Sequence, residues 1–171
     1  NLSKLLKDYK LNPQLEANAN AVLAEAFLNL EEKDSAVTKL QIAQQFTKIN
    51  TEKARYRFIL GQLYEELGKR EQALASYQSV IDMNRKADRE YVIQAYARKA
   101  QLFDFQNGDK AQMIKMFDQL VKNRENRPFL DLIYHQIGVY YDKSNDSELA
   151  LKNYNLSLKK TKDNTYLAAS N

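Results

Sequence analysis

The chain has 171 residues, of which 44% are hydrophobic and 28% charged, a composition typical of a globular protein rather than a disordered one. Its net charge is +4, but acidic and basic residues alternate along most of the sequence, which argues against a nucleic-acid binder with one basic face. The absence of cysteine excludes disulfides and cysteine-ligated metals, and no apolar stretch approaches the roughly 20 residues that a transmembrane helix needs.

Apolar residues recur at three- and four-residue spacing along almost the whole chain, and this spacing predicts amphipathic helices. The 4 glycines and 2 prolines are too few for the many turns of an all-β fold, and no segment predicts a strand. In chain order, the predicted helices cover residues 2–10, 14–30, 35–48, 52–67, 70–84, 89–106, 110–123, 128–143 and 147–161, with a last partial helix near 165–171.

Short polar breaks with helix-capping chemistry separate these helices. Such short turns force neighbouring helices into antiparallel hairpins. Pro128 stands where the first turn of a helix tolerates proline. The breaks fall at Asp34–Ser35, Asn50–Thr51, Gly68, Asn107–Gly108–Asp109 and Asn145–Asp146–Ser147.

One pattern of small and aromatic residues repeats along the chain. Its two clearest copies are Leu60-Gly61-x-x-Tyr64 followed by Ala73-x-x-x-Tyr77, and Ile137-Gly138-x-x-Tyr141 followed by Ala150-x-x-x-Tyr154. In both copies the glycine precedes the alanine by the same interval. Looser copies run through Ala24, Phe27, Ala36 and Leu40, and through Ala100, Phe103, Met113 and Phe117.

These residues resemble the tetratricopeptide repeat, which places small and aromatic residues where two antiparallel helices cross. The resemblance implies an all-α fold, a right-handed superhelical solenoid of antiparallel helix pairs. It assigns repeats to residues 17–50, 54–87, 93–126 and 131–164, the end of a preceding repeat to 1–13 and the start of a following one to 165–171. We therefore expect one solenoid segment of a longer protein.

The sequence departs from the family pattern in three ways. The repeats are longer than usual, and the closing proline is replaced by Arg85 and Lys162. The tryptophan of the first helix is replaced by Arg57, Tyr96 and Tyr134 in the last three repeats.

A second resemblance rests on a composition rich in Lys, Asn and Tyr and on the sequence NRPFLDLIYHQIG at residues 126–138. Both are similar to the large tetratricopeptide-repeat lipoproteins of Bacteroidota, and most of all to the one in the type IX secretion and gliding-motility machinery. This resemblance implies a periplasmic scaffold for protein partners, anchored to the outer membrane through a lipidated N-terminus outside this sequence. The alternative function is that of a cytoplasmic helical-repeat regulator that binds a peptide or nucleic acid. A third hypothesis is an accessory domain of an enzyme.

No arrangement of residues predicts catalysis. His135 is the only histidine, and neither a nucleophile-elbow motif nor a glycine-rich phosphate loop is present. We therefore expect no enzyme activity, no cofactor and no metal site.

The family resemblance also implies a protein-binding groove lined by the first helix of each pair. Leu28 and Glu66 fall on its positions, and Phe58, Phe105 and His135 are expected to be its bulkiest exposed side chains. The basic clamp with which some members hold carboxylates is missing, and a groove that serves only as a spacer stays open as an alternative. The main candidates are Asn18, Glu25, Asn29, Arg55, Phe58, Gln62, Glu65, Gln94, Gln101, Asp104, Phe105, His135, Val139 and Asp142.

Overall fold

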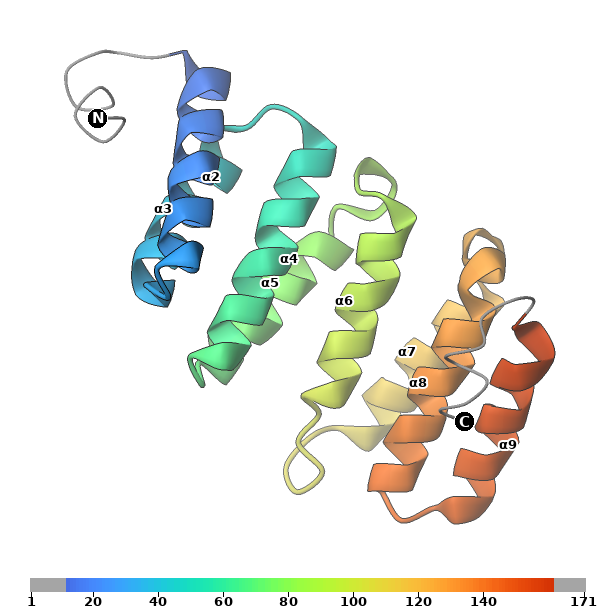
Figure 1. The fold of residues 1–171 in the computed structure, drawn as a ribbon. Helices are drawn as coiled ribbons and strands as arrows, with labels where there is room; N and C mark the ends of the chain where they lie inside the picture. Colours follow the sequence, from blue (N-terminus) through green and yellow to red (C-terminus); the bar gives the residue numbers. More distant parts are fainter. Residues whose placement is uncertain (1–11, 162–171) are drawn as a thin grey trace. The chain divides into compact units, whose positions relative to one another are not determined.

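The computed structural model describes residues 12–161, and within this range the chain forms eight α-helices, two short 3-10 helices and no strand (Figure 1). The all-α prediction is therefore confirmed, whereas the helices predicted at 2–10 and 165–171 lie outside the described residues. The helices are α2 (Pro13–Asn29), α3 (Lys33–Phe46), α4 (Asn50–Glu66), α5 (Arg70–Ile81), α6 (Arg89–Gln101), α7 (Lys110–Lys122), α8 (Leu130–Lys143) and α9 (Ser147–Lys160), and the 3-10 helices are η1 (Asn84–Lys86) and η2 (Arg124–Phe129).

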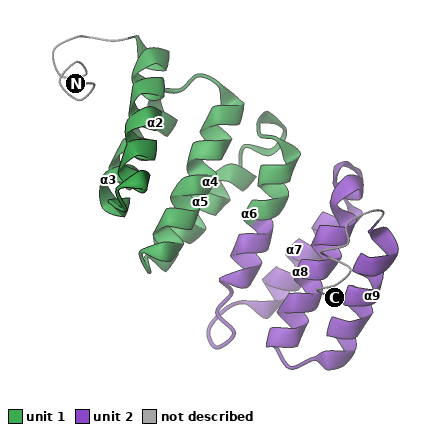
Figure 2. Cartoon of the chain, in the orientation of Figure 1, with its two compact units in different colours: residues 1–95 green, residues 96–171 purple. Residues whose placement is uncertain are grey.

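The chain divides into two compact units, residues 1–95 and residues 96–171, with the boundary inside α6 (Figure 2). In the first unit, α2 pairs with α3 and α4 with α5, and α4 also packs against α3. In the second unit, α8 pairs with α9, and α7 contacts α8 and η2. Each pair is an antiparallel hairpin, as the short turns predict.

Three of the hairpins end their first helix with the same backbone turn. Glu31, Gly68 and Asn145 have φ of 60°, 68° and 60°, in the left-handed region. After each, the next backbone N–H donates to the carbonyl oxygen of an aromatic residue five positions earlier, with N···O distances of 2.8 to 2.9 Å. This is the hydrogen-bond pattern of a Schellman turn, which satisfies carbonyl groups that the helix end leaves free. The three acceptors are Phe27, Tyr64 and Tyr141.

The close helix crossings at the two repeat glycines are confirmed. A methyl group built on Gly61 would lie 2.5 Å from a ring carbon of Tyr77, and one on Gly138 would lie 2.5 Å from Tyr154. Both tyrosines come from the second helix of the same pair, so their rings occupy the space that a side chain at the glycine would need. In the first repeat Ala24 and Leu40 hold the corresponding positions and belong to one buried cluster.

The core of the first unit joins both of its hairpins. Val37 and Leu40 of α3 pack in the same buried cluster as Leu60 and Leu63 of α4. Burying aliphatic side chains of this size typically contributes about 1.5–3 kcal/mol each, so the contact between successive pairs stabilises the stack.

In the second unit, an aromatic cluster forms where the chain leaves α6. The rings of Phe103, Phe105 and Phe117 all lie within 5.4 Å of the ring of Tyr140, measured between centroids. Tyr140 is only 3% exposed and stands at the centre of the cluster. The sequence pattern singled out its neighbour Tyr141 instead.

The predicted end of the helix at residue 106 is wrong, because α6 ends at Gln101. Asp104 then accepts hydrogen bonds from the backbone N–H groups of Gln106 and Asn107, at 2.9 and 3.1 Å. This side chain stabilises a turn that competes with the helix, which places Asp104 and Phe105 in a loop.

Other helix boundaries also differ from prediction. The break expected at Asp34–Ser35 falls earlier, because Glu31 takes the left-handed turn conformation that a non-glycine residue rarely adopts. Asn50 starts α4 rather than capping it. Pro128 lies inside η2, so α8 begins two residues after it rather than at it. The caps at Asp109 and Asp146 are confirmed, since each accepts a hydrogen bond from the backbone N–H three residues on.

Candidate protein-binding groove

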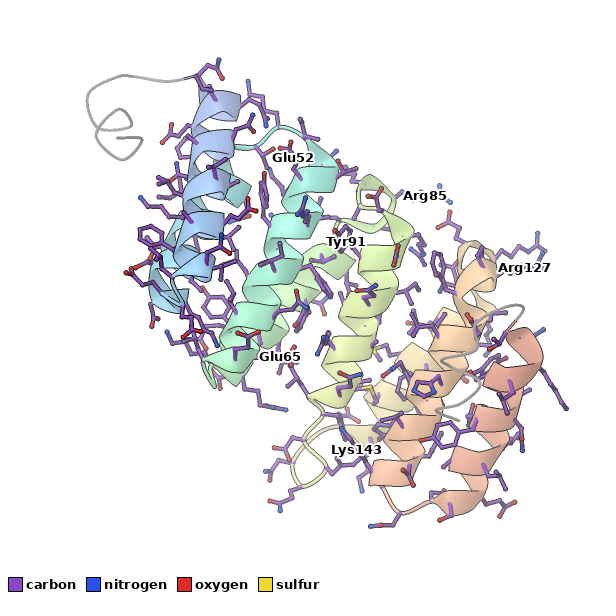
Figure 3. The ribbon with its side chains drawn as sticks, viewed as in Figure 1. Glu52, Glu65, Arg85, Tyr91, Arg127 and Lys143 are labelled. Carbon is purple, nitrogen blue, oxygen red and sulfur yellow. The ribbon has the colours of Figure 1, made fainter. Side chains whose placement is uncertain are left out.

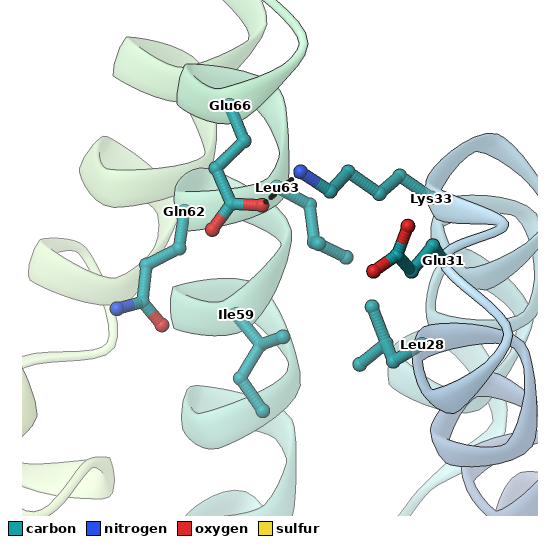
Figure 4. Close-up of a pocket in the computed structure, with 7 residues that line it drawn as sticks. All are labelled: Leu28, Glu31, Lys33, Ile59, Gln62, Leu63 and Glu66. Carbon is teal, nitrogen blue, oxygen red and sulfur yellow. Dashed lines mark ion pairs between the residues drawn. The ribbon is translucent and has the colours of Figure 1, made fainter.

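A pocket of about 650 Å³ opens between α2 and α4, the first helices of two successive hairpins (Figure 4). Both helices belong to the first unit. Seven residues line the pocket, and they come from α2, the turn that follows it, the start of α3 and α4: Leu28, Glu31, Lys33, Ile59, Gln62, Leu63 and Glu66.

The pocket combines an apolar floor with a polar rim. Leu63 is 4% exposed and belongs to the buried cluster of the first unit, against which Leu28 and Ile59 also pack. Because this floor is part of the core, its shape does not depend on a ligand. Such preformed concave surfaces lower the entropic cost of binding.

The rim carries a slight negative charge. Lys33 Nζ lies 2.9 Å from Glu66 Oε2, and the two side chains are 42% and 51% exposed (Figure 4). At that exposure the ion pair contributes little stability, typically below about 1 kcal/mol. Glu31 adds a second carboxylate on the same rim, so the lining carries two acids and one base.

Three residues that the family resemblance assigns to the groove meet in this pocket. They are Leu28, Gln62 and Glu66. The resemblance did not point to Ile59 or Leu63, which lie beside those positions, nor to Lys33, which enters from the start of α3. Lys33 reaches the pocket because the turn after α2 falls at Glu31, whereas the sequence predicted the break at Asp34–Ser35.

The expectation that Phe58 is an exposed anchor is wrong. Its side chain is 5% exposed, with ring centroids 5.5 Å from Tyr77 and 5.6 Å from Tyr91. Tyr91 belongs to α6 (Figure 3), so the beginning of the next repeat covers the face that helical periodicity left open. Phe58 is therefore a core residue and not a residue of the groove.

A related arrangement in the second unit is more open. His135 stands at the repeat position of Phe58, and its ring lies 5.8 Å from that of Tyr154. Tyr154 is half-buried, unlike Tyr77, which has no exposure. Burial raises the pKa of Tyr154, and the nearby Asp142 carboxylate raises that pKa further.

The repeat position of Asp142 is held by Glu65 in the repeat at residues 54–87. Glu65 accepts a hydrogen bond from the Tyr77 hydroxyl. It lies near the C-terminal end of α4 (Figure 3), and it is half-buried rather than freely exposed. Two of the predicted groove carboxylates therefore act on a tyrosine of their own repeat.

The remaining candidates fall into three groups. Asn18, Glu25, Asn29 and Arg55 are exposed on α2 and α4. Gln94 and Gln101 of α6 donate to Glu90 Oε1 at 3.1 Å and to Gln136 Oε1 at 3.0 Å. Val139 is half-buried on α8, while Asp104 and Phe105 lie in the loop after α6. Their role in binding stays a prediction.

Between residues 12 and 161, no three or more histidine and acidic side chains gather where they could hold a metal ion. In the same range, every helix is too short or too polar to cross a membrane.

Residues 54–86 match the family model of the tetratricopeptide repeat. A comparison with curated proteins finds no match to this sequence. Among solved structures, the chain is similar to the crystal structure of MamA, with a TM-score of 0.63, 18% identity and coverage of 93% of this chain and 84% of that one. A second MamA structure gives a TM-score of 0.59 with 17% identity, covering 84% of this chain and 72% of that chain.

BtubC (BKLC) from P. vanneervenii has a TM-score of 0.67 and 17% identity, and the alignment covers 93% of this chain and 70% of that chain. At such identities the likeness concerns the fold, and none of these comparisons indicates a catalytic family. Residues 54–86 are therefore similar to a tetratricopeptide repeat, and the chain shares the helical-repeat fold of these solved structures.

Proposed function

We propose that this chain is a non-catalytic scaffold that binds a protein partner through the pocket between α2 and α4. The observation that carries the proposal is the preformed apolar floor of Leu28, Ile59 and Leu63 beneath a polar rim. An extended peptide or a partner helix can place one apolar side chain on such a floor while its backbone meets the amide and carboxylates of the rim. The tetratricopeptide repeat at residues 54–86 supports this class of function.

The pocket also suggests which partner segment it accepts. Two carboxylates against one ammonium group on the rim favour an apolar residue with a basic neighbour. The Lys33–Glu66 pair can open at low cost, because both groups are close to half exposed. A basic side chain of the partner would then replace Lys33 beside Glu66.

Within this class, we propose a scaffold of the cell envelope. Its support is the resemblance of residues 126–138 to the lipoprotein of the type IX secretion and gliding-motility machinery. The proposed location is the periplasm, with attachment to the outer membrane through a lipidated N-terminus outside this sequence. The cytoplasmic regulator remains the competing proposal.

The binding face is tested by site-specific crosslinking. Because these 171 residues contain no cysteine, Gln62→Cys and Gln45→Cys each add one attachment point for a benzophenone label to this segment. Gln45 is exposed on α3, away from the pocket, and serves as the matched control. We expect the label at position 62, and not at position 45, to crosslink one defined protein in source cells. Equal crosslinking at both positions would refute the α2–α4 face as the binding surface.

The location is tested separately by fractionating source cells that carry an epitope-tagged full-length gene. Recovery in the outer-membrane fraction with a lipid-modified N-terminal cysteine supports the envelope proposal. Recovery in the cytoplasm contradicts it and favours the regulator, whichever result the crosslinking gives.

A further inference from the structure

A second pocket lies on a different face of the first unit, over α3, α4 and α5. Its volume is about 260 Å³. On α4 this pocket uses Arg57, Leu60 and Tyr64. Three of the four α4 residues in the α2–α4 pocket, Ile59, Gln62 and Glu66, each follow one of these by two positions. Since two residues correspond to a rotation of about 200° around a helix, the two pockets occupy opposite faces of α4. The second pocket is lined by Gln41, Gln44, Arg57, Leu60, Tyr64, Ala75, Ser76 and Ser79.

Arg57 is the one charged residue of this lining, and it is half-buried. Its Nε–H donates to Gln44 Oε1 at 3.1 Å, and its Nη1 donates to the Ser79 carbonyl oxygen at 3.0 Å. Both acceptors are neutral. A guanidinium has five N–H donors, so these bonds fix its plane and use two of the five.

No carboxylate pairs with Arg57 among residues 12–161. Its two hydrogen-bond acceptors are both neutral, and every other lining residue is uncharged. A partly buried cation without an anionic partner is unusual, since charged groups inside proteins are normally paired. The pocket therefore carries one unit of positive charge, held on a planar group whose orientation is already fixed.

One hydroxyl group of the lining adds a hydrogen-bond donor to those of the guanidinium. The Tyr64 hydroxyl oxygen accepts a hydrogen bond from Gln41 Nε2 at 2.8 Å, which leaves the hydroxyl proton available to donate. The Ser79 hydroxyl already donates its proton to the Ser76 carbonyl oxygen, at 2.7 Å, and so adds no donor. Arg57 and Tyr64 line the same pocket, and N–H donors of a guanidinium together with an O–H donor suit the two oxygens of a carboxylate.

We infer that the pocket of Arg57 and Tyr64 binds the carboxylate of an acidic side chain on a second protein partner. The chain would then bind partners on two faces, one through the α2–α4 pocket and one through Arg57. This inference does not depend on what occupies the α2–α4 pocket.

The test uses the peptide acetyl-Gly-Glu-Gly-amide, which carries one carboxylate, and acetyl-Gly-Gln-Gly-amide as its neutral match. In ¹H–¹⁵N spectra of the whole chain, the glutamate peptide should saturably shift the Arg57 Nε–H and Ser76 amide signals, and the glutamine peptide should not. Arg57→Gln should weaken binding at least tenfold. Lys48→Gln, at an exposed residue between α3 and α4 that lines neither pocket, should leave binding unchanged.

Since Arg57→Gln also removes the bonds to Gln44 and Ser79, Tyr64→Phe provides a second variant that deletes only a hydroxyl group. We expect it to weaken binding by about threefold or more while the unfolding midpoint stays close to that of the wild type. Equal shifts with both peptides, or unchanged binding in Arg57→Gln, would overturn the inference. Acetate that saturates these signals at lower concentration than the peptide would overturn the assignment to a protein side chain, because a small free carboxylate would then be the better ligand.

Discussion

Substituting Gly61 by alanine tests the packing that defines the repeat. The added methyl group would lie 2.5, 2.7 and 2.9 Å from three ring carbons of Tyr77, all shorter than normal carbon contacts. Tyr77 has no exposed surface, its ring packs against Phe58, and its hydroxyl donates to Glu65. The ring therefore cannot move aside without breaking other contacts.

The magnitude is the difference between two opposing effects. Alanine stabilises a helix interior by about 1 kcal/mol relative to glycine. Overpacking a core costs about 1–3 kcal/mol, and the fixed position of Tyr77 places Gly61→Ala near the upper end. We expect a net loss of about 2 kcal/mol, which for a chain of this size lowers the melting temperature by about 4–8 °C.

Gly138→Ala is the matched control. The methyl group meets Tyr154 at the same 2.5 Å, but Tyr154 is half-buried and its ring can turn toward solvent. Overpacking near the lower limit of about 1 kcal/mol then cancels the gain in helix propensity, so the stability should stay within about 0.5 kcal/mol of the wild type.

A double variant separates overpacking from other causes. Gly61→Ala with Tyr77→Leu reproduces the Ala24 and Leu40 pair of the first repeat, both buried. We expect it to be more stable, by about 1 kcal/mol or more, than the sum of its two single changes predicts. Urea unfolding followed by circular dichroism measures all four variants. If Gly61→Ala is as stable as the wild type, or if the double variant shows no coupling, the close crossing does not determine stability here.

Three further outcomes follow from named contacts. Phe58→Ala should cost about 3–5 kcal/mol in urea unfolding, as a core residue does, whereas Gln45→Ala on the exposed side of α3 should cost almost nothing. Asp146→Ala removes the side-chain cap of α9 and should cost about 1 kcal/mol, most of which Asp146→Asn restores. Because the pKa of Tyr154 is raised, the folded state holds the hydroxyl proton of Tyr154 more tightly than the unfolded state does. The contribution of this hydroxyl to the stability is therefore complete below about pH 10 and is lost as the pH rises through the folded-state pKa. Tyr154→Phe should therefore lose less stability than the wild type between pH 9 and pH 11.

The sequence predicted the helices and their pairing because both depend on local signals. Three-residue apolar spacing, Gly68 in the left-handed region and the caps at Asp109 and Asp146 each act within one or two helical turns. The glycine–tyrosine crossings were also predictable, since an identical interval in two copies implies an identical contact. Glu31 was missed because it adopts the left-handed conformation without the residue type that usually marks it.

The binding pockets were less accessible to sequence reasoning. Gln62 was found through the family resemblance, but Lys33 reaches the α2–α4 pocket only because the preceding turn places it there. The second pocket depends on Arg57, which departs from the family pattern, and on side chains from three helices, α3, α4 and α5. No local pattern joins such residues, so their meeting had to come from the structure.

The contrast between Phe58 and His135 explains why helical periodicity fails at a groove. Both residues hold the same repeat position, and each ring faces the tyrosine of its own second helix. Periodicity therefore predicts the same exposure for both. Phe58 is buried because Tyr91 of α6 also covers it, at 5.6 Å. In a stack of repeats, the first helix of one repeat is thus exposed or buried according to the residues that open the next repeat. A prediction of groove residues must therefore include the first helix of the next repeat, which the sequence of a single repeat does not contain.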